Sequence, residues 1–272
     1  MSKLATASLL AFSLAHAQTF EVASVKPSPP TEQWGYRFAP GGRTILTDFR
    51  VRDMIMLAWH IQDFRVIGAG GWMESEHFNI EAKAPGNPSE EKSRLMLRSL
   101  LADRFQLKLH RETRSLPKYA LVRAKGELRL TPSKQGSCTP FENYTGIQPP
   151  PATLSPPMCG IQQRLRRPAN GAPVLEDRIT GGTMPWFART LATTLDREVS
   201  DETGISGAYD FTIHYAPDDS LLARIAPDAS PTDNPGPSIF TALQEQLGLR
   251  LESRKGPVEV FVVDHAERPA PN

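Results

Sequence analysis

The sequence has few cysteines, no marked excess of charge and, after its N-terminal segment, no long hydrophobic run. A membrane-spanning helix needs about 20 consecutive apolar residues, and no later stretch reaches that length. We therefore expect no transmembrane segment in the mature chain. The 31 Lys and Arg residues are balanced by 30 Asp and Glu residues. Nucleic-acid-binding proteins carry a basic excess gathered on one face, so we expect no nucleic-acid partner.

Common catalytic signatures are also missing. The sequence contains no His-Glu-x-x-His, no Gly-x-Ser-x-Gly, no P-loop and no EF-hand loop, which are short motifs that carry a recognised chemistry. We therefore predict a non-catalytic protein with no cofactor. His110 and Glu112 are weak candidates for metal ligands. They share one face of an expected strand, but zinc needs three or four convergent ligands.

The N-terminal segment has the three parts of a secretory signal peptide. Lys3 supplies the positive charge, an apolar run extends from Leu4 to Leu14, and Ala15 and Ala17 are the small residues before a cleavage point. The apolar run is too short to span a bilayer. We predict a signal peptide over residues 1–17 and a periplasmic or secreted mature chain.

The two cysteines are Cys138 and Cys159. An even pair in an exported protein favours a disulfide, and the proline-rich segment around them shows no apolar periodicity that would order it by core burial. We predict a Cys138–Cys159 disulfide. Two free thiols, or a metal site that lacks its other ligands, are the alternatives.

An internal repeat dominates the organisation of the chain. Residues 71–80 align without a gap on residues 204–213, at an offset of 133. A second pattern follows each copy at an offset of 142. It pairs Leu101, Phe105, Leu107 and Leu109 with Leu243, Leu247, Leu249 and Leu251. The order of both patterns is the same, so we predict a duplication.

The expected fold is α+β, with two similar lobes that each contain an antiparallel or mixed sheet and two helices packed on one face. Ser89, Thr183 and Ser238 precede apolar stripes at helical spacing and are predicted to cap the helices that follow. We place the first lobe at residues 18–130, a proline-rich insert at 131–180 and the second lobe at 181–272.

Four loop residues are candidates for ligand binding. Trp72, beside Gly71, is a possible aromatic platform for a sugar or peptide, and Trp34 is a second one; covering the edge of a core is the alternative role for such rings. Asp201 and Gly204 lie in an Asp-Glu-Thr-Gly loop. Asp201 equally suits a turn, in which its carboxylate bonds to its own backbone.

Several segments together resemble one known family. They are residues 20–27, 96–105, 110–114, 201–211 and 252–260. The set is similar to an acidobacterial family of exported proteins of unknown function, and the likeness covers nearly the whole mature chain. Some members are fused behind membrane-embedded zinc peptidases of the antibiotic-sensor type. The resemblance implies an extracytoplasmic sensing or interaction domain, and it brings no catalytic residues.

These observations predict an exported binding or sensing module for a protein, a peptide or another envelope component. Sheet edges would be available for strand addition by such a partner. One alternative is a cell-envelope hydrolase whose site includes His110 and Glu112. Another is a small-ligand sensor, with Trp72 and the glycine loops lining a pocket between the lobes.

Overall fold

The computed structural model describes residues 19–29, 33–140, 155–166, 172–217 and 236–270. These residues form an α+β fold with five helices and three four-stranded sheets, so the predicted fold class is confirmed. No helix in these ranges is both long and apolar enough to cross a membrane. The predicted signal peptide, residues 1–17, lies outside them.

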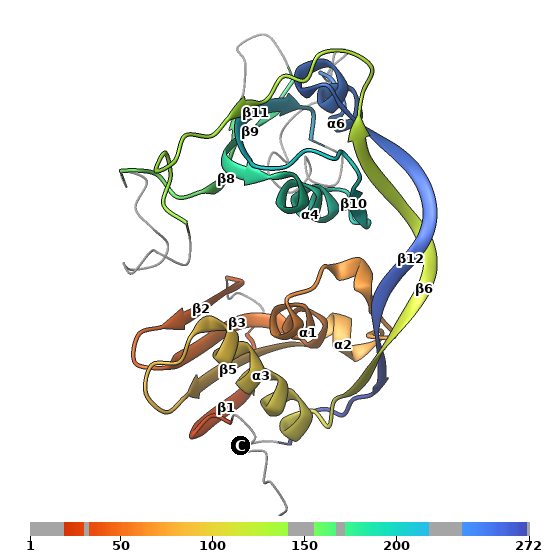
Figure 1. Ribbon diagram of the computed structural model, residues 1–272. Coiled ribbons are helices and arrows are strands. Elements are labelled where there is room, and N and C mark those ends of the chain that lie inside the picture. Colours follow the sequence, from red (N-terminus) through yellow and green to blue (C-terminus); the bar gives the residue numbers. More distant parts are fainter. Residues whose placement is uncertain (1–18, 30–32, 141–154, 167–171, 218–235, 271–272) are drawn as a thin grey trace, which may run out of the picture. The chain divides into compact units, whose positions relative to one another are not determined.

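The chain divides into two compact units (Figure 1). Unit 1 consists of residues 1–113 and 259–272, and unit 2 consists of residues 114–258. These bounds differ from the predicted segments, because residues 259–272 belong to unit 1 rather than to a second lobe. Much of the predicted insert at 131–180 is also part of the sheet of unit 2, although some of that insert lies outside the described residues.

The sheet of unit 1 is antiparallel, with the strand order β1-β5-β3-β2. Its strands are β1 (Val22–Pro27), β2 (Gly35–Ala39), β3 (Arg43–Arg50) and β5 (His77–Lys83). The register places Val25, Ile80 and Leu46 side by side on one face. Side chains alternate between the two faces of a strand, and all three of these are buried. That face therefore carries the core.

Two main helices cover this face, α1 (Val51–Trp59) and α3 (Glu90–Arg104). Their buried residues belong to the same hydrophobic cluster as those of the sheet. Between α1 and β5 the chain forms three short elements, η1 (Asp63–Arg65), β4 (Val66–Ile67) and α2 (Trp72–Ser75). The predicted cap of α3 is confirmed, since the Ser89 hydroxyl accepts a hydrogen bond from the backbone N–H of Lys92.

The sheet of unit 2 is also antiparallel, in the order β7-β11-β9-β8. Its strands are β7 (Thr131–Pro132), β8 (Gly160–Arg166), β9 (Val174–Thr183) and β11 (Ala208–Tyr215). The helices are α4 (Met184–Thr194) and α6 (Ile239–Ala242), which continues into the π-helical turn η3 (Leu243–Leu247). The predicted caps Thr183 and Ser238 are confirmed.

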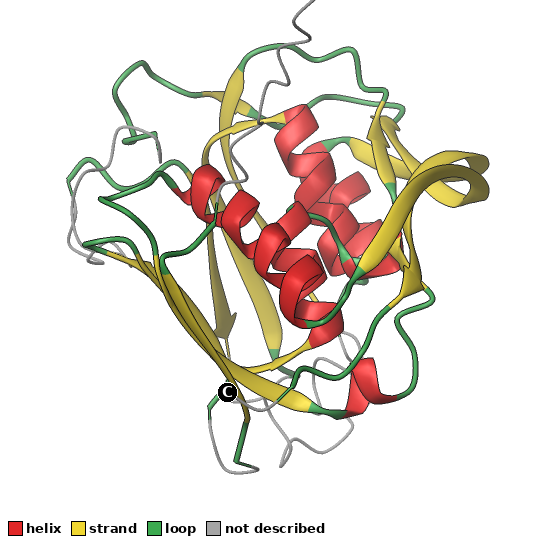
Figure 2. Cartoon of the chain, turned by 90° about the horizontal axis from the view of Figure 1, so that it is seen from below, coloured by secondary structure: helices red, strands yellow, loops and turns green. Residues whose placement is uncertain are grey.

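A third sheet contains the two longest strands, β6 (Lys108–Arg123) and β12 (Leu249–His265), which lie next to each other. Its order is β10-β6-β12-β4, where β10 is Val199–Asp201. In unit 1, β4 pairs in parallel with β12; in unit 2, β10 pairs in parallel with β6. Figure 2 shows the strands of the chain in yellow and its helices in red.

The two units repeat one order of elements: strand, helix, short strand, strand, helix, long strand. The first series, β3-α1-β4-β5-α3-β6, starts in unit 1. The second series, β9-α4-β10-β11-α6-β12, starts in unit 2. This shared order of elements is a feature of the structure. The origin of the two units by duplication stays a prediction.

Candidate functional site

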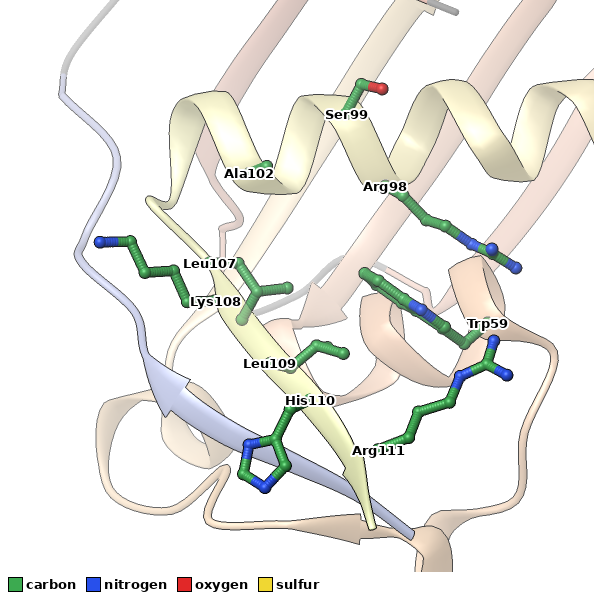
Figure 3. Close-up of a pocket in the computed structure, with 9 residues that line it drawn as sticks. All are labelled: Trp59, Arg98, Ser99, Ala102, Leu107, Lys108, Leu109, His110 and Arg111. Carbon is green, nitrogen blue, oxygen red and sulfur yellow. The ribbon is translucent and has the colours of Figure 1, made fainter. Parts of the chain in front are cut away.

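An open pocket of about 570 Å³ lies in unit 1 (Figure 3), which is within the usual size range of small-ligand sites. Helix α3 contributes Arg98, Ser99 and Ala102 to its wall. Strand β6 and the residue before it contribute residues 107–111, and Trp59 closes the wall from the end of α1. We call this the Arg98 pocket. Trp59, Arg98 and Arg111 gather at one end of it, as the figure shows.

The end of α1 fixes the position of Arg98. Helix α1 stops at His60, whose backbone is left-handed with φ 54°. The last carbonyl groups of a helix have no partner within the helix. Arg94 donates from Nη1 to the carbonyl oxygen of Leu57 at 2.6 Å, and Arg98 donates from Nε to that of Ala58 at 2.9 Å. Two arginines of α3 thus satisfy the end of α1.

The Arg98 guanidinium is held against an aromatic ring. Its central carbon lies 5.2 Å from the centre of the Trp59 ring, a distance typical of cation–π contacts. In the part of the chain that the structure describes, Arg98 forms no ion pair with a carboxylate. Burial, and then the nearby positive charges of Arg111 and Arg94, lower the pKa of Arg98. The fold therefore holds the positive charges of Arg98, Arg111 and Arg94 near one another.

Arg111 has only a weak partner. Its guanidinium lies 5.1 Å from the centre of the Phe261 ring, and its Nη1 lies 3.9 Å from Glu259 Oε2. The Arg111 side chain is 58 % exposed, and exposed ion pairs of this kind contribute little. None of the described residues that line the pocket is acidic, whereas Arg98, Lys108 and Arg111 are basic. The pocket is therefore suited to an anion.

The edge of β6, rather than one of its faces, borders the pocket. Residues 108–111 all line it, although successive side chains of a strand point to opposite faces. On one side β6 neighbours β12, and on the other β10 pairs only with residues 119–121. Along residues 108–111 this second edge has no strand partner among the described residues. Its backbone groups are available to an added strand.

The predicted metal candidates His110 and Glu112 meet a further acidic residue, Asp264, that sequence reasoning missed. His110 Nδ1 lies 2.9 Å from Asp264 Oδ1, and His110 Nε2 lies 3.7 Å from Glu112 Oε2. The hydrogen bond to Asp264, and then the charges of Asp264 and Glu112, raise the pKa of His110. No group of three or more His, Cys, Asp or Glu in the described ranges is arranged to hold a metal ion.

Trp72 packs against the protein instead of presenting two free faces. Its ring meets Phe78 edge-to-face at 6.4 Å, and the Arg268 guanidinium lies 5.3 Å from its centre. Arg268 in turn donates from Nε and Nη2 to Glu76 Oε1, at 3.0 and 2.8 Å. Gly71 precedes α2 with φ 64°, a conformation that favours glycine. Ligand binding by Trp72 and Gly71 stays a prediction, with one face of the indole already in contact with Arg268.

Asp201 forms the turn that was the alternative to its binding role. Its Oδ1 accepts hydrogen bonds from the backbone N–H of Thr203 at 3.0 Å and from the Thr203 hydroxyl at 2.8 Å. Gly204 follows with φ 64°. This pattern is an Asx turn. Both residues lie in unit 2, whereas Trp72 and Gly71 lie in unit 1. A ligand role for Asp201 and Gly204 stays a prediction.

Trp34 is the most exposed aromatic residue near the sheet of unit 1, at 59 %. It stacks on Phe49 with ring centres 5.1 Å apart, and Tyr36 meets the same ring edge-to-face at 6.2 Å. The residues form an aromatic row along edge strand β2. The platform role of Trp34 stays a prediction.

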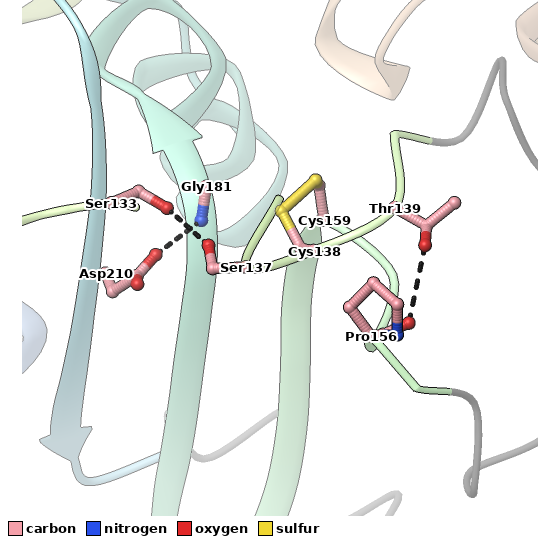
Figure 4. The surroundings of a disulfide bond; sticks show 8 residues. All are labelled: Ser133, Ser137, Cys138, Thr139, Pro156, Cys159, Gly181 and Asp210. Carbon is pink, nitrogen blue, oxygen red and sulfur yellow. Dashed lines mark hydrogen bonds between the residues drawn. A yellow bond between two sulfur atoms is a disulfide. The ribbon is translucent and has the colours of Figure 1, made fainter. Parts of the chain in front are cut away.

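The predicted disulfide is confirmed in unit 2 (Figure 4). Cys138 and Cys159 are joined at an S–S distance of 2.01 Å. The bond packs on Gly181, where an added Cβ would lie 2.6 Å from Cys138 Sγ and φ is 66°. The backbone N–H of Gly181 also donates to Asp210 Oδ1 at 2.7 Å. Only glycine suits this position.

Unit 2 also buries a carboxylate, Asp177, which is 5 % exposed. Tyr215 donates its hydroxyl hydrogen to Asp177 Oδ2 at 2.8 Å, and Gln163 donates from Nε2 to Asp177 Oδ1 at 2.9 Å. Burial raises the pKa of Asp177, although the two hydrogen bonds oppose the shift. The group is surrounded by its own unit and forms part of the core.

A protein-family model places this chain among known sequences. The model describes a protein family of unknown function, DUF3738, and it matches residues 52–266. Because this range is most of the chain, the chain belongs to the DUF3738 family. Comparisons with curated proteins and with solved structures gave no match.

Proposed function

We propose that this DUF3738 protein is an extracytoplasmic binding or sensing module for a protein, a peptide or another envelope component. It acts without catalysis, and it holds an anionic group of its partner in the Arg98 pocket. The observation that carries the proposal is that Arg98 and Arg111 both line the pocket, with no acidic residue among the described residues of its wall.

The chemistry of these side chains favours binding over proton transfer. A guanidinium stays protonated at any physiological pH, and its planar fork matches the oxygen atoms of carboxylates and phosphates. Trp59 keeps the Arg98 guanidinium in place before a ligand arrives. A pre-organised group loses less conformational entropy on binding, which favours affinity.

Export is supported by two features of the chain. The predicted signal peptide at residues 1–17 directs it out of the cytoplasm. The Cys138–Cys159 disulfide is of the kind that persists in oxidising compartments. The resemblance to exported acidobacterial proteins, some of them fused behind membrane zinc peptidases, supports a sensing role at the envelope.

Retention of envelope material on the immobilised protein tests the proposal. Arg98→Ala/Arg111→Ala should lose the components that the wild-type protein retains and that salt elutes, because screening weakens contacts between exposed charges. Arg178→Ala/Arg189→Ala removes the same charge from two exposed residues of unit 2. This control protein should still retain the envelope components. Equal retention by wild type and the pocket variant would contradict the proposal.

One observation favours a second candidate, an envelope hydrolase. His110 is oriented by Asp264 at 2.9 Å beside the pocket, as a general base commonly is by a carboxylate. The test is release of new amino groups or reducing ends from purified envelope polymers. Release by the wild type that is lost in both His110→Gln and Asp264→Asn would establish this candidate. No release by the wild type would remove it.

A further inference from the structure

We infer that the Arg98 pocket takes the C-terminal end of an extended peptide whose last side chain is aliphatic. The terminal carboxylate lies on Arg98 and Arg111, and the peptide backbone adds to the free edge of β6. This inference rests on the proposed binding function and names the chemical class of its ligand.

The carboxylate is indicated by the unused donors of Arg98. Its Nε–H already donates to the carbonyl oxygen of Ala58, which fixes the plane of the guanidinium beside Trp59. The Nη groups form no ion pair within the described ranges. A fixed fork of N–H donors suits two parallel hydrogen bonds to one carboxylate.

The charge balance favours a single negative charge over two. Glu259 lies 3.9 Å from Arg111 and offsets part of its positive charge. A phosphate group, with about two negative charges near neutral pH, would face this carboxylate at close range. A C-terminal carboxylate carries one charge and suits the remaining positive charge better.

The strand edge indicates a peptide rather than a free acid. Residues 108–111 border the pocket along their backbone, and their outer edge has no strand partner in the described part of the chain. An extended peptide can add to such an edge through its own N–H and C=O groups. Helix α3 forms the opposite wall, so the peptide would lie between α3 and β6.

The apolar lining indicates the last side chain. Leu107 is buried, Leu109 packs against the hydrophobic cluster of unit 1, and Ala102 adds a methyl group from α3. Leu109 lies between the arginine end of the pocket and the end with Leu107 and Ala102, as Figure 3 shows, so it would contact the final side chain beside the carboxylate. An aliphatic residue gains by leaving water at this place, whereas a charged one would lose hydration.

Peptide libraries test the inference directly. Immobilised purified protein is offered hexapeptides that are randomised except for a final Leu or Val, as C-terminal acids and, separately, as C-terminal amides. Retained peptides are identified by mass spectrometry. The dissociation constant of the most enriched acid is then compared with that of its amide twin. We expect the amide to bind at least about tenfold more weakly, since charge-assisted hydrogen bonds are the stronger kind.

Matched variants assign the effect to the two arginines. Arg98→Gln/Arg111→Gln should weaken binding of the acid peptide at least about tenfold and leave the amide unchanged. Arg98 also satisfies the end of α1, so Arg111→Gln alone serves as a variant that keeps this contact. Arg111→Gln alone should also weaken binding of the acid peptide. Arg178→Gln/Arg189→Gln in unit 2 should bind like the wild type.

Other ligands define the outcomes that overturn the inference. Equal binding of acid and amide, or no enrichment of any peptide, excludes a C-terminal ligand even where the envelope retention test succeeds. Displacement of the acid peptide by decanoate, with no loss on N-methylation of alternate peptide amides, would make a free aliphatic acid the ligand. Stronger displacement by inorganic phosphate than by acetate would make it a phosphate. Weaker binding of alternately N-methylated peptides supports strand addition.

Discussion

The two units share an order of elements but hold different side chains at the same place in that order. The predicted offset of 142 pairs Arg98 of α3 with Phe240 of α6. In unit 1 the arginine lies against Trp59 at the pocket. In unit 2 the phenylalanine meets Tyr119 edge-to-face at 5.4 Å. One backbone frame can therefore present a charged pocket in one unit and an aromatic pair in the other.

The units also differ in what stabilises them. The described core of unit 1 is one large hydrophobic cluster, and its buried polar side chains are the neutral Thr44 and Ser93. Unit 2 instead has the disulfide and the buried carboxylate of Asp177. We expect the stability of unit 1 to depend mainly on packing. The stability of unit 2 should depend also on the disulfide and on pH.

The largest expected effects come from a matched pair of core substitutions. Leu101 and Leu243, which the offset pairs, are both fully buried. Leu101→Ala and Leu243→Ala should each lower the free energy of unfolding by about 2–5 kcal/mol, because each leaves a cavity. Hydrogen exchange should accelerate in β3 and β5 after the first change, and in β9 and β11 after the second. Equal acceleration in both sheets would show that the units do not open separately.

Removal of the disulfide should affect unit 2 selectively. Cys138 and Cys159 are 21 residues apart, and closing a loop of that size restricts the unfolded chain by about 3 kcal/mol on the entropy model. Cys138→Ser/Cys159→Ser should lower stability by about that amount and speed exchange in β8 and β9. Reduction of the wild-type protein is the matching control. Faster exchange in β3 and β5 of comparable size would argue against a local effect.

Asp177 should make unit 2 sensitive to pH. Its folded-state pKa is raised above the ordinary value of 3.8, so the folded state binds the proton more tightly than the unfolded state. Stability should therefore fall as pH rises from 3.8 through the folded-state pKa. In Asp177→Asn this part of the slope should disappear, as measured by urea unfolding at a series of pH values. If the variant's stability changes with pH in the same way as that of the wild type, Asp177 is not the source of the pH dependence.

Loss of the helix caps should have the smallest effect. The hydroxyls of Ser89 and Ser238 accept from the backbone N–H groups of Lys92 at 3.3 Å and Thr241 at 3.2 Å. Ser89→Ala and Ser238→Ala should each cost about 1 kcal/mol. Thermal unfolding of the two variants shows whether the 15-residue helix α3 and the shorter α6 depend equally on their caps. A cost near zero at Ser238 would indicate that tertiary packing alone holds α6.

Sequence reasoning succeeded where the cause was local and was incomplete where distant segments meet. The caps of α3, α4 and α6 depend on residues three positions apart, so their pattern is visible along the chain. His110 and Asp264 are 154 residues apart, and only strand pairing brings them together. Trp59, Arg98 and Arg111 come from three elements, and the signal that could have found Arg98 is its place on α3 one helical turn after Arg94.

The sequence by itself determined the α+β class, the helix starts and the disulfide pairing, because each follows from spacing, capping chemistry or the number of cysteines. Only the tertiary structure decided that β4 pairs with β12 and β10 with β6, and that residues 259–272 complete unit 1. Such pairings join strands that are far apart in the chain, and many registers satisfy the same alternation of apolar residues. The pocket inherits this dependence, because its charge arises from side chains that become neighbours only after folding.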